Sequence, residues 1–141
     1  MPKRPWYPQL DNIGKHVGRI AFRAPAGYTI AATGRRVEAE PGSVATYDVV
    51  VPSSFNFAIA KCHVHEAGGD VRLGAYLLRP RPHDTALVDG AREILQGLRA
   101  LVGPFPYPEF ALVEVPEEFG ASGSMAATVD IHGRARHRRA S

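Results

Sequence analysis

Few side chains in this 141-residue chain are of the types that carry out chemistry. His63 and His65 stand two positions apart in a segment predicted to be a strand, so both imidazoles would share one face and could touch a metal. Two ligands fall short of the four that a closed zinc site needs, so a solvated strand face is the favoured interpretation. Cys62 is interpreted as an inert buried cysteine, because only the neighbouring histidines could lower the pKa of its thiol.

Acidic residues give no stronger indication of a site. Glu117 and Glu118 are adjacent, and adjacent side chains of an extended chain point apart, so a polar loop is predicted rather than a carboxylate pair. The only His-Glu pair is His65-Glu66, and the residue three beyond Glu66 is Gly69. A zinc helix of the His-Glu-x-x-His type, with two imidazoles on one face and a glutamate as general base, is therefore missing.

The basic character of the chain is confined to its last eight residues. The net charge of +3 comes from 17 basic and 14 acidic residues, and four of the cations are arginines in this stretch: Arg134, Arg136, Arg138 and Arg139. Such a tail could attract nucleic acid through phosphates. It contains no aromatic residue to stack on bases, and no nucleic-acid module accompanies it, so no specific nucleic-acid binding is predicted.

Cysteine content and hydropathy predict where the protein resides. A single cysteine makes no internal disulfide, which is typical of a reducing compartment. The proline-rich start does not read as a signal peptide, and no apolar stretch approaches the roughly 20 residues of a membrane span. A cytoplasmic location without a membrane span is expected.

Alternating apolar residues between Gly and Pro turns predict a chain dominated by strands. The predicted strands cover residues 17–23, 28–33, 37–40 (weakly), 45–51, 57–65, 71–78 and 110–115. One helix is predicted over about 84–102, with Asp84 as its N-cap, an apolar stripe along one side, and Gly103-Pro104 as its end.

The motif that follows this helix carries a family resemblance. It reads Gly-Pro-Phe-Pro-Tyr-Pro-Glu-Phe-Ala-Leu-Val-Glu-Val-Pro over 103–116 and leads into a Phe-Gly-small loop. It resembles the zinc aminopeptidases of the membrane alanyl aminopeptidase family, which are gluzincins. In that family a Gly-x-Pro-Tyr-Pro segment, a strand ending in Val-Pro and a Gly-Ala-Met-Glu-Asn loop precede the catalytic helix. The likeness covers roughly residues 5 to 125.

The resemblance implies a β-rich α+β fold. Residues 1–61 would be the C-terminal part of a β-sandwich-like domain, and 62–125 the strand-helix-strand start of a gluzincin catalytic domain. Residues 126–141 are expected to be a disordered basic tail.

The resemblance also implies one site. Gly123, Ser124 and Met125 would form a loop at the edge of the substrate cleft. Ala126 and Ala127 take the places of the family's Glu and Asn, so the glutamate that grips the substrate's amino group is missing.

The function expected from these features is that of a partial zinc aminopeptidase-like protein. The parent activity is zinc-dependent removal of N-terminal residues from peptide substrates. This chain, with no zinc ligands of its own, is expected to be inactive alone and to need the missing remainder of the domain. A gene interrupted near residue 124 or truncated would explain the abrupt loss of likeness. The alternatives are a non-catalytic β-rich binding module and, less favoured, a basic-tailed nucleic-acid associate.

Overall fold

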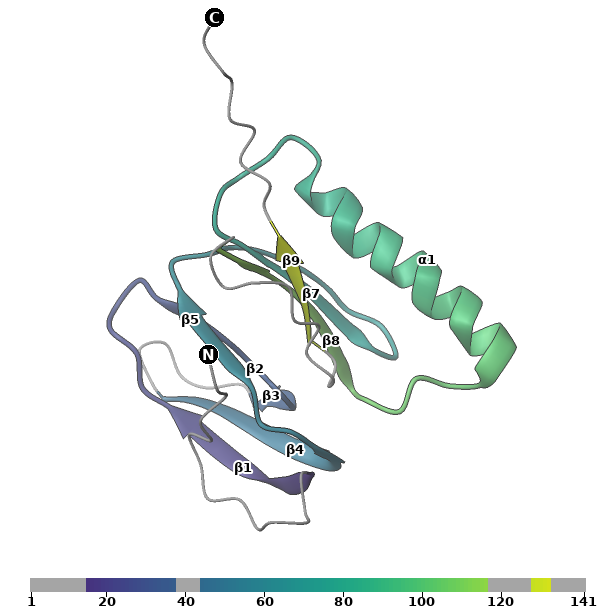
Figure 1. Ribbon diagram of the computed structural model, residues 1–141, viewed down its shortest axis with the longest axis horizontal. Helices are drawn as coiled ribbons and strands as arrows, with labels where there is room; N and C mark the ends of the chain where they lie inside the picture. Colours follow the sequence, from purple (N-terminus) through teal and green to yellow (C-terminus); the bar gives the residue numbers. More distant parts are fainter. Residues whose placement is uncertain (1–14, 38–43, 117–127, 133–141) are drawn as a thin grey trace, which may run out of the picture.

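The computed structural model describes residues 15–37, 44–116 and 128–132. Strands dominate these ranges, which confirms the β-rich prediction, and the single long helix lies along one side of them (Figure 1). The elements are β1 (His16–Phe22), β2 (Thr29–Ala32), β3 (Arg35–Val37), β4 (Ala45–Ser53), β5 (Phe57–Ala60), β6 (His63–Ala67), β7 (Arg72–Leu77), α1 (Asp84–Val102), β8 (Glu109–Val115) and β9 (Thr128–His132).

The strands form three sheets. Strands β1, β4 and β3 pair antiparallel in that order, and β2 pairs antiparallel with β5. The third sheet has the order β6-β7-β8-β9. Its first pair is an antiparallel hairpin, whereas β7 pairs parallel with β8, and β8 parallel with β9. Helix α1 makes the connection between β7 and β8, as a parallel pair requires.

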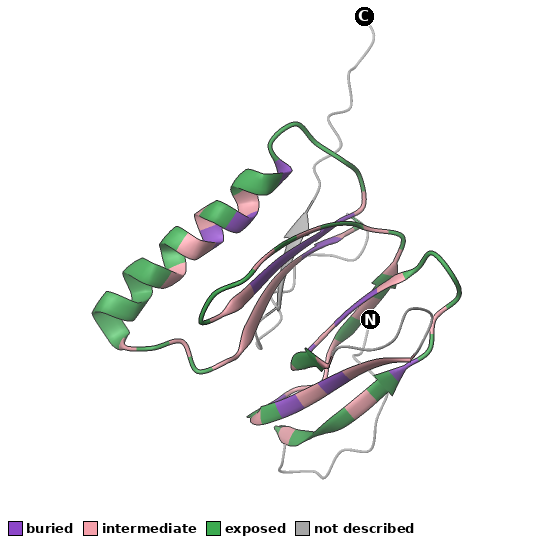
Figure 2. Cartoon of the chain, turned by 180° about the vertical axis from the view of Figure 1, so that it is seen from behind, coloured by how far each residue is buried: buried purple, intermediate pink, exposed green. Residues whose placement is uncertain are grey.

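The third sheet is covered on both faces (Figures 1 and 2). On one face Leu73 and Leu77 of β7 pack against Val88 of α1. On the other face Tyr76 of β7 packs with Ala31 of β2. Because successive side chains of a strand point to opposite faces, a strand between two layers is apolar throughout. The central strand β7 is therefore buried along almost its whole length.

The turn between β2 and β3 requires glycine. Gly34 has a φ of +107°, a backbone angle that residues other than glycine rarely adopt. A Cβ there would lie 2.8 Å from the carbonyl oxygen of Asp48 in β4. Gly34 therefore allows β2 and β3 to diverge into different sheets while staying close to β4.

Helix α1 has the bounds predicted from the sequence, but its start is built differently. The N-cap position is His83, which makes no side-chain capping bond, so the prediction that Asp84 is the N-cap is wrong. Asp84 is the first helical residue and its carboxylate accepts the Arg81 N–H at 2.7 Å. The Asp84 side chain therefore holds the linker that precedes the helix, because it binds the backbone of Arg81 in that linker. Gly103, at φ +95°, ends the helix as expected.

The apolar stripe of α1 is only partly covered within the described residues. Val88 and Ala91 are buried against the sheet, whereas Ile94 is 65% exposed and Leu101 81% exposed. The first half of the helix therefore supplies most of its packing. Among the described residues, no helix is both long and apolar enough to cross a membrane.

The structure changes two of the predictions and tests a third only in part. The segment 57–65 is two strands, because Lys61 and Cys62 separate β5, which pairs with β2, from β6, which pairs with β7. The weak strand predicted at 37–40 can be followed only at Val37, the last residue of β3 (Arg35–Val37), which begins earlier than predicted; residues 38–40 lie outside the described residues. Part of the predicted disordered tail is ordered, since Thr128–His132 form β9 against β8. The rest of 126–141 lies outside the described residues.

Candidate functional site

The two histidines considered as metal ligands lie on strand β6 but do not meet a third ligand. His63 is exposed, and His65 Nε2 lies 3.8 Å from Asp84 Oδ2 at the start of α1. Within the parts of the chain that the structure describes, no group of three or more His, Cys, Asp or Glu side chains is placed to hold a metal. The donor set of these residues therefore does not fit a catalytic zinc ion, which takes three protein ligands.

Cys62 is half-buried between β5 and β6. Burial, and to a smaller extent the negative charge of Glu114, raises the pKa of its thiol. A raised pKa keeps the thiol protonated near neutral pH, and the thiolate is the reactive form. The geometry therefore favours a structural cysteine.

The residues predicted for the cleft edge lie outside the described residues. Gly123, Ser124 and Met125 fall in the segment between β8 and β9, as do Glu117 and Glu118. The strands that flank this segment are parallel neighbours, with Val115 of β8 beside His132 of β9.

A buried carboxylate marks the end of β8 nearest that segment. Glu114 has a side chain only 5% exposed, and it forms an ion pair with the Arg81 guanidinium. Its other oxygen accepts the Leu78 N–H at 2.8 Å. Leu78, Arg81, Asp84 and Glu114 are referred to below as the Glu114 cluster. Two carboxylates of this cluster bind backbone N–H groups of the linker between β7 and α1, so they fix where the helix begins.

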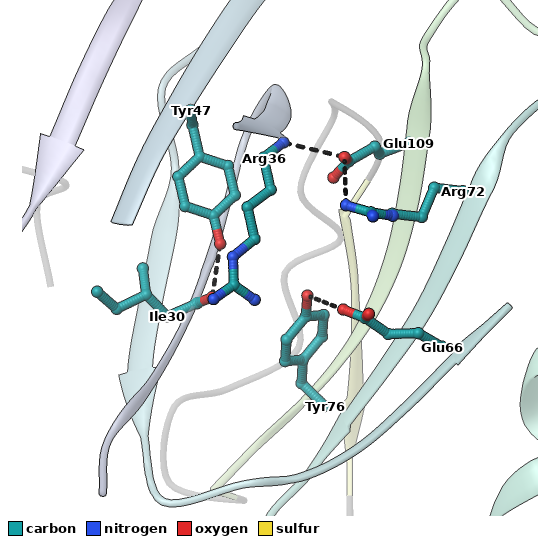
Figure 3. A network of polar contacts seen from close by, with 7 residues as sticks. All are labelled: Ile30, Arg36, Tyr47, Glu66, Arg72, Tyr76 and Glu109. Carbon is teal, nitrogen blue, oxygen red and sulfur yellow. Dashed lines mark hydrogen bonds and ion pairs between the residues drawn. The ribbon is translucent and has the colours of Figure 1, made fainter. Parts of the chain in front are cut away.

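A second polar network lies at the opposite end of β8, between the sheets. It is referred to below as the Glu109 network and comprises Arg36, Tyr47, Glu66, Arg72, Tyr76 and Glu109 (Figure 3). Glu109 Oε1 accepts the backbone N–H of Arg36 at 2.9 Å and lies 3.5 Å from Arg72 Nη1. Tyr47 donates to the Ile30 carbonyl at 2.6 Å, and Tyr76 contacts Glu66 at 3.4 Å. Glu109 therefore joins β3 to β7 and β8, the Tyr47 hydroxyl joins β4 to β2, and the Tyr76 hydroxyl joins β7 to β6.

The electrostatics of this network suit structure better than proton transfer. Burial raises the pKa of Tyr47 to about 12, and burial also raises the pKa of Tyr76. Both hydroxyls are therefore neutral near pH 7 and act as hydrogen-bond donors. The hollow beside them is lined by Ala31, Ala32, Gly34, Tyr47, Tyr76, Glu109 and Ala111, with room for about one water molecule. A substrate would not fit there.

Glu109 and Glu114 were not singled out by the sequence analysis. A signal for Glu114 was present, because it stands between Val113 and Val115 in a strand whose other residues from Phe110 onward are apolar. A charge at such a position is buried only with partners. Glu109 directly follows a proline and begins its strand, so nothing local distinguished it from a turn residue.

Comparisons with solved structures find proteins whose fold is similar to this βαβ unit packed against smaller antiparallel sheets. Yeast LTA4 hydrolase is 11% identical over 84% of this chain and 19% of its own, with a TM-score of 0.65. An M1 zinc metallopeptidase from Deinococcus radiodurans is 15% identical over 84% of this chain and 30% of its own, with a TM-score of 0.58. A two-domain M1 zinc metallopeptidase bound to L-arginine is 16% identical over 72% and 26%, with a TM-score of 0.52.

These likenesses show that the chain has a gluzincin aminopeptidase-like fold, as the resemblance of the Pro-Tyr-Pro segment predicts. The chain spans between 19% and 30% of the length of these three proteins. No family model matches the sequence, and no curated protein matches it either.

Proposed function

We propose that this chain is a partial zinc aminopeptidase-like protein that forms scaffold and one edge of a peptide cleft, and that it does not cleave peptides alone. The observation that carries the proposal is the match of 84% of the chain to less than a third of an M1 zinc metallopeptidase. A fold piece of this size supplies packing surfaces, while the chemistry of a metallopeptidase depends on its metal.

The cleft edge is assigned to the segment between β8 and β9. Gly123, Ser124 and Met125 lie in it, at the positions of the Gly-Ala-Met part of the family's loop. The Glu109 network and the Glu114 cluster hold the two ends of β8, and so support the strand that leads into this loop. Ala126 stands at the amino-group anchor, and a methyl group makes no ion pair with an ammonium ion. We therefore expect weak or no selection for a free peptide amino terminus.

The zinc-dependent step is assigned to protein outside this sequence. The printed sequence contains no His-Glu-x-x-His motif, and the described residues assemble no three-ligand group. A catalytic zinc ion would supply a water of lowered pKa as the attacking nucleophile. Because the described residues hold no such ligand group, we expect this chain to show neither zinc binding nor hydrolysis.

Two measurements test the proposal. Purified protein is incubated with aminoacyl-arylamide substrates, with added zinc or with a chelator, and zinc retention is measured by equilibrium dialysis. We expect no chelator-sensitive turnover and no stoichiometric zinc. A variant with both histidines of β6 replaced, His63→Ala with His65→Ala, is the matched control and should retain as little zinc as the parent. Chelator-sensitive turnover by the parent would overturn the proposal.

A further inference from the structure

The charges of the described residues are divided unevenly between the parts of the fold. Strands β1 to β5 lie in residues 15–37 and 44–60, which carry five arginines and lysines but a single acid, Asp48. The remaining described residues, 61–116 and 128–132, carry six cations and eight acids. The first part therefore has a net charge of +4 and the second a net charge of −2. Basic character is thus not confined to the last eight residues of the chain.

Most of the cations of the first part follow one face of strand β1. Successive side chains of a strand point to opposite faces, and Ile20 and Phe22 of β1 pack into the core cluster that contains Tyr47. The alternate positions from 15 to 23 are all exposed, and they carry Lys15, Val17, Arg19, Ala21 and Arg23. The outer face of β1 therefore alternates cations with apolar side chains over a length of about 26 Å.

The neighbouring strands continue this outer face. In the register of the sheet, Asp48 of β4 stands between Arg19 of β1 and Arg35 of β3. Arg19 Nε and Nη2 donate to the two oxygens of Asp48 at 2.6 Å and 3.1 Å, so a guanidinium of this face already binds a carboxylate through both oxygens. One carboxylate between two arginines leaves an excess of positive charge. Val17 and Val50, which are 59% and 62% exposed, add apolar surface beside it.

The chemistry of this face fits a protein partner better than a nucleic acid. Its cations attract carboxylates and phosphates alike. Its exposed aliphatic side chains complement the aliphatic side chains of a protein, which a phosphate backbone lacks. Surfaces that bind single-stranded nucleic acid offer aromatic rings on which bases stack. Among the exposed side chains that the structure describes on β1, β3 and β4, none is Phe, Tyr or Trp.

We propose that the outer face of β1, β3 and β4 is a docking surface for an extended acidic segment of another protein. The cations of β1 stand four residues apart with an apolar residue midway, which is the pattern that one face of a second extended chain can match. The segment would carry an acidic residue at every fourth position and an aliphatic residue midway between two acids. This surface is separate from the predicted cleft edge and does not depend on peptidase activity.

Binding of a designed peptide to the full chain tests this surface. The probe is a fluorescein-labelled peptide of sequence Glu-Ser-Val-Ser-Glu-Ser-Val-Ser-Glu, and its matched control has Gln in place of each Glu. Fluorescence anisotropy measures both. We expect the acidic peptide to bind with a Kd in the micromolar range that rises with salt, and the control to bind at least about tenfold more weakly. Absence of salt-dependent binding would overturn the proposal.

Two double variants with the same loss of charge locate the site. Lys15→Gln with Arg23→Gln removes two cations from the outer face and should raise the peptide Kd about fivefold or more. Arg79→Gln with Arg99→Gln removes two cations from the linker and from α1, and should change the Kd less than about twofold. All four side chains are exposed, so both variants should keep the circular dichroism spectrum of the parent. Equal weakening in the two variants would contradict a site on this face.

A third variant separates a protein partner from a nucleic acid. Val50→Thr keeps the shape and charge of the face and removes apolar surface, so it should weaken binding of the acidic peptide. Labelled oligothymidylate is the competing probe and should bind more weakly than the peptide. Tighter binding of oligothymidylate, unaffected by Val50→Thr, would identify a phosphate-binding surface and overturn the proposal.

Discussion

The two ends of strand β8 each carry a glutamate, and the two carboxylates bind different parts of the molecule. Glu109 lies on the face of β8 that carries Ala111 and Val113, toward β2 and β3. Glu114 lies on the opposite face, toward the linker that leads into α1. The separation of five residues places them on opposite faces because side chains alternate along a strand.

The difference between the two carboxylates lies in how completely each is enclosed and paired. Glu114, 5% exposed, has a guanidinium on one oxygen and a backbone N–H on the other. Glu109, 17% exposed, has one backbone N–H and a guanidinium at 3.5 Å. The better paired carboxylate fixes a local linker, whereas the less well paired one joins distant sheets. Stability should therefore depend more on Glu114 than on Glu109.

The largest expected effect is that of Glu114→Ala. It leaves the Leu78 N–H and the Arg81 guanidinium without their partner in a mostly buried place, which should cost ~2–3 kcal/mol of unfolding free energy. Urea denaturation monitored by circular dichroism measures the loss. Glu114→Gln keeps an acceptor for Leu78 and should lose less. A loss in Glu114→Ala no larger than that of a surface ion pair would contradict the comparison.

A smaller effect is expected from Tyr47→Phe on strand β4. The hydroxyl donates at 2.6 Å to the Ile30 carbonyl in a buried place, so its removal should cost about 1 kcal/mol of unfolding free energy. Tyr76→Phe is the matched control, because its hydroxyl contact is 3.4 Å long and should contribute less. Thermal unfolding of both variants measures the difference, and a greater loss in Tyr76→Phe would reverse the ranking.

The smallest effect is expected from Arg99→Ala. Arg99 in the last turn of α1 bonds to Asp70 at 2.9 Å, but the two side chains are 61% and 85% exposed. Surface pairs of this kind contribute below ~1 kcal/mol to unfolding free energy and are screened by salt. Urea titrations at low and high salt measure the contribution. A loss comparable with that of Glu114→Ala would mean that enclosure does not determine the strength of these pairs.

Local chemistry made much of the fold predictable. The bounds of α1 follow from the prolines before it and from Gly103-Pro104 after it. Alternating residues located β1 and β7 to within one residue. The split at Lys61 was missed because a change of sheet within an apolar run leaves no local signal. Strand β9 was missed although Val129 and Ile131 alternate with polar residues, since the arginines that follow dominated the interpretation.

The polar sites were harder to predict because their partners are distant in sequence. Glu109 meets Arg36 across 73 positions and Glu114 meets Arg81 across 33. Such pairings depend on how the sheets pack against each other, and the spacing of apolar residues along the sequence does not predict that packing. The missing zinc motif could be read directly, since it depends on spacing within one helix. The assignment of Gly123, Ser124 and Met125 to a cleft edge stays a prediction, because these residues lie outside the described ranges.

The mixed order of the third sheet has a consequence for how the protein folds. The hairpin of β6 and β7 joins neighbours in sequence and can close in roughly 1–10 μs. The parallel pair of β7 and β8 can form only after the connection through α1 has brought β8 beside β7. Closing this longer connection costs more chain entropy than closing the hairpin. Non-local parallel pairing of this kind slows folding. We therefore expect the hairpin to form first and the sheet to grow outward from β7, with β9 the last strand added.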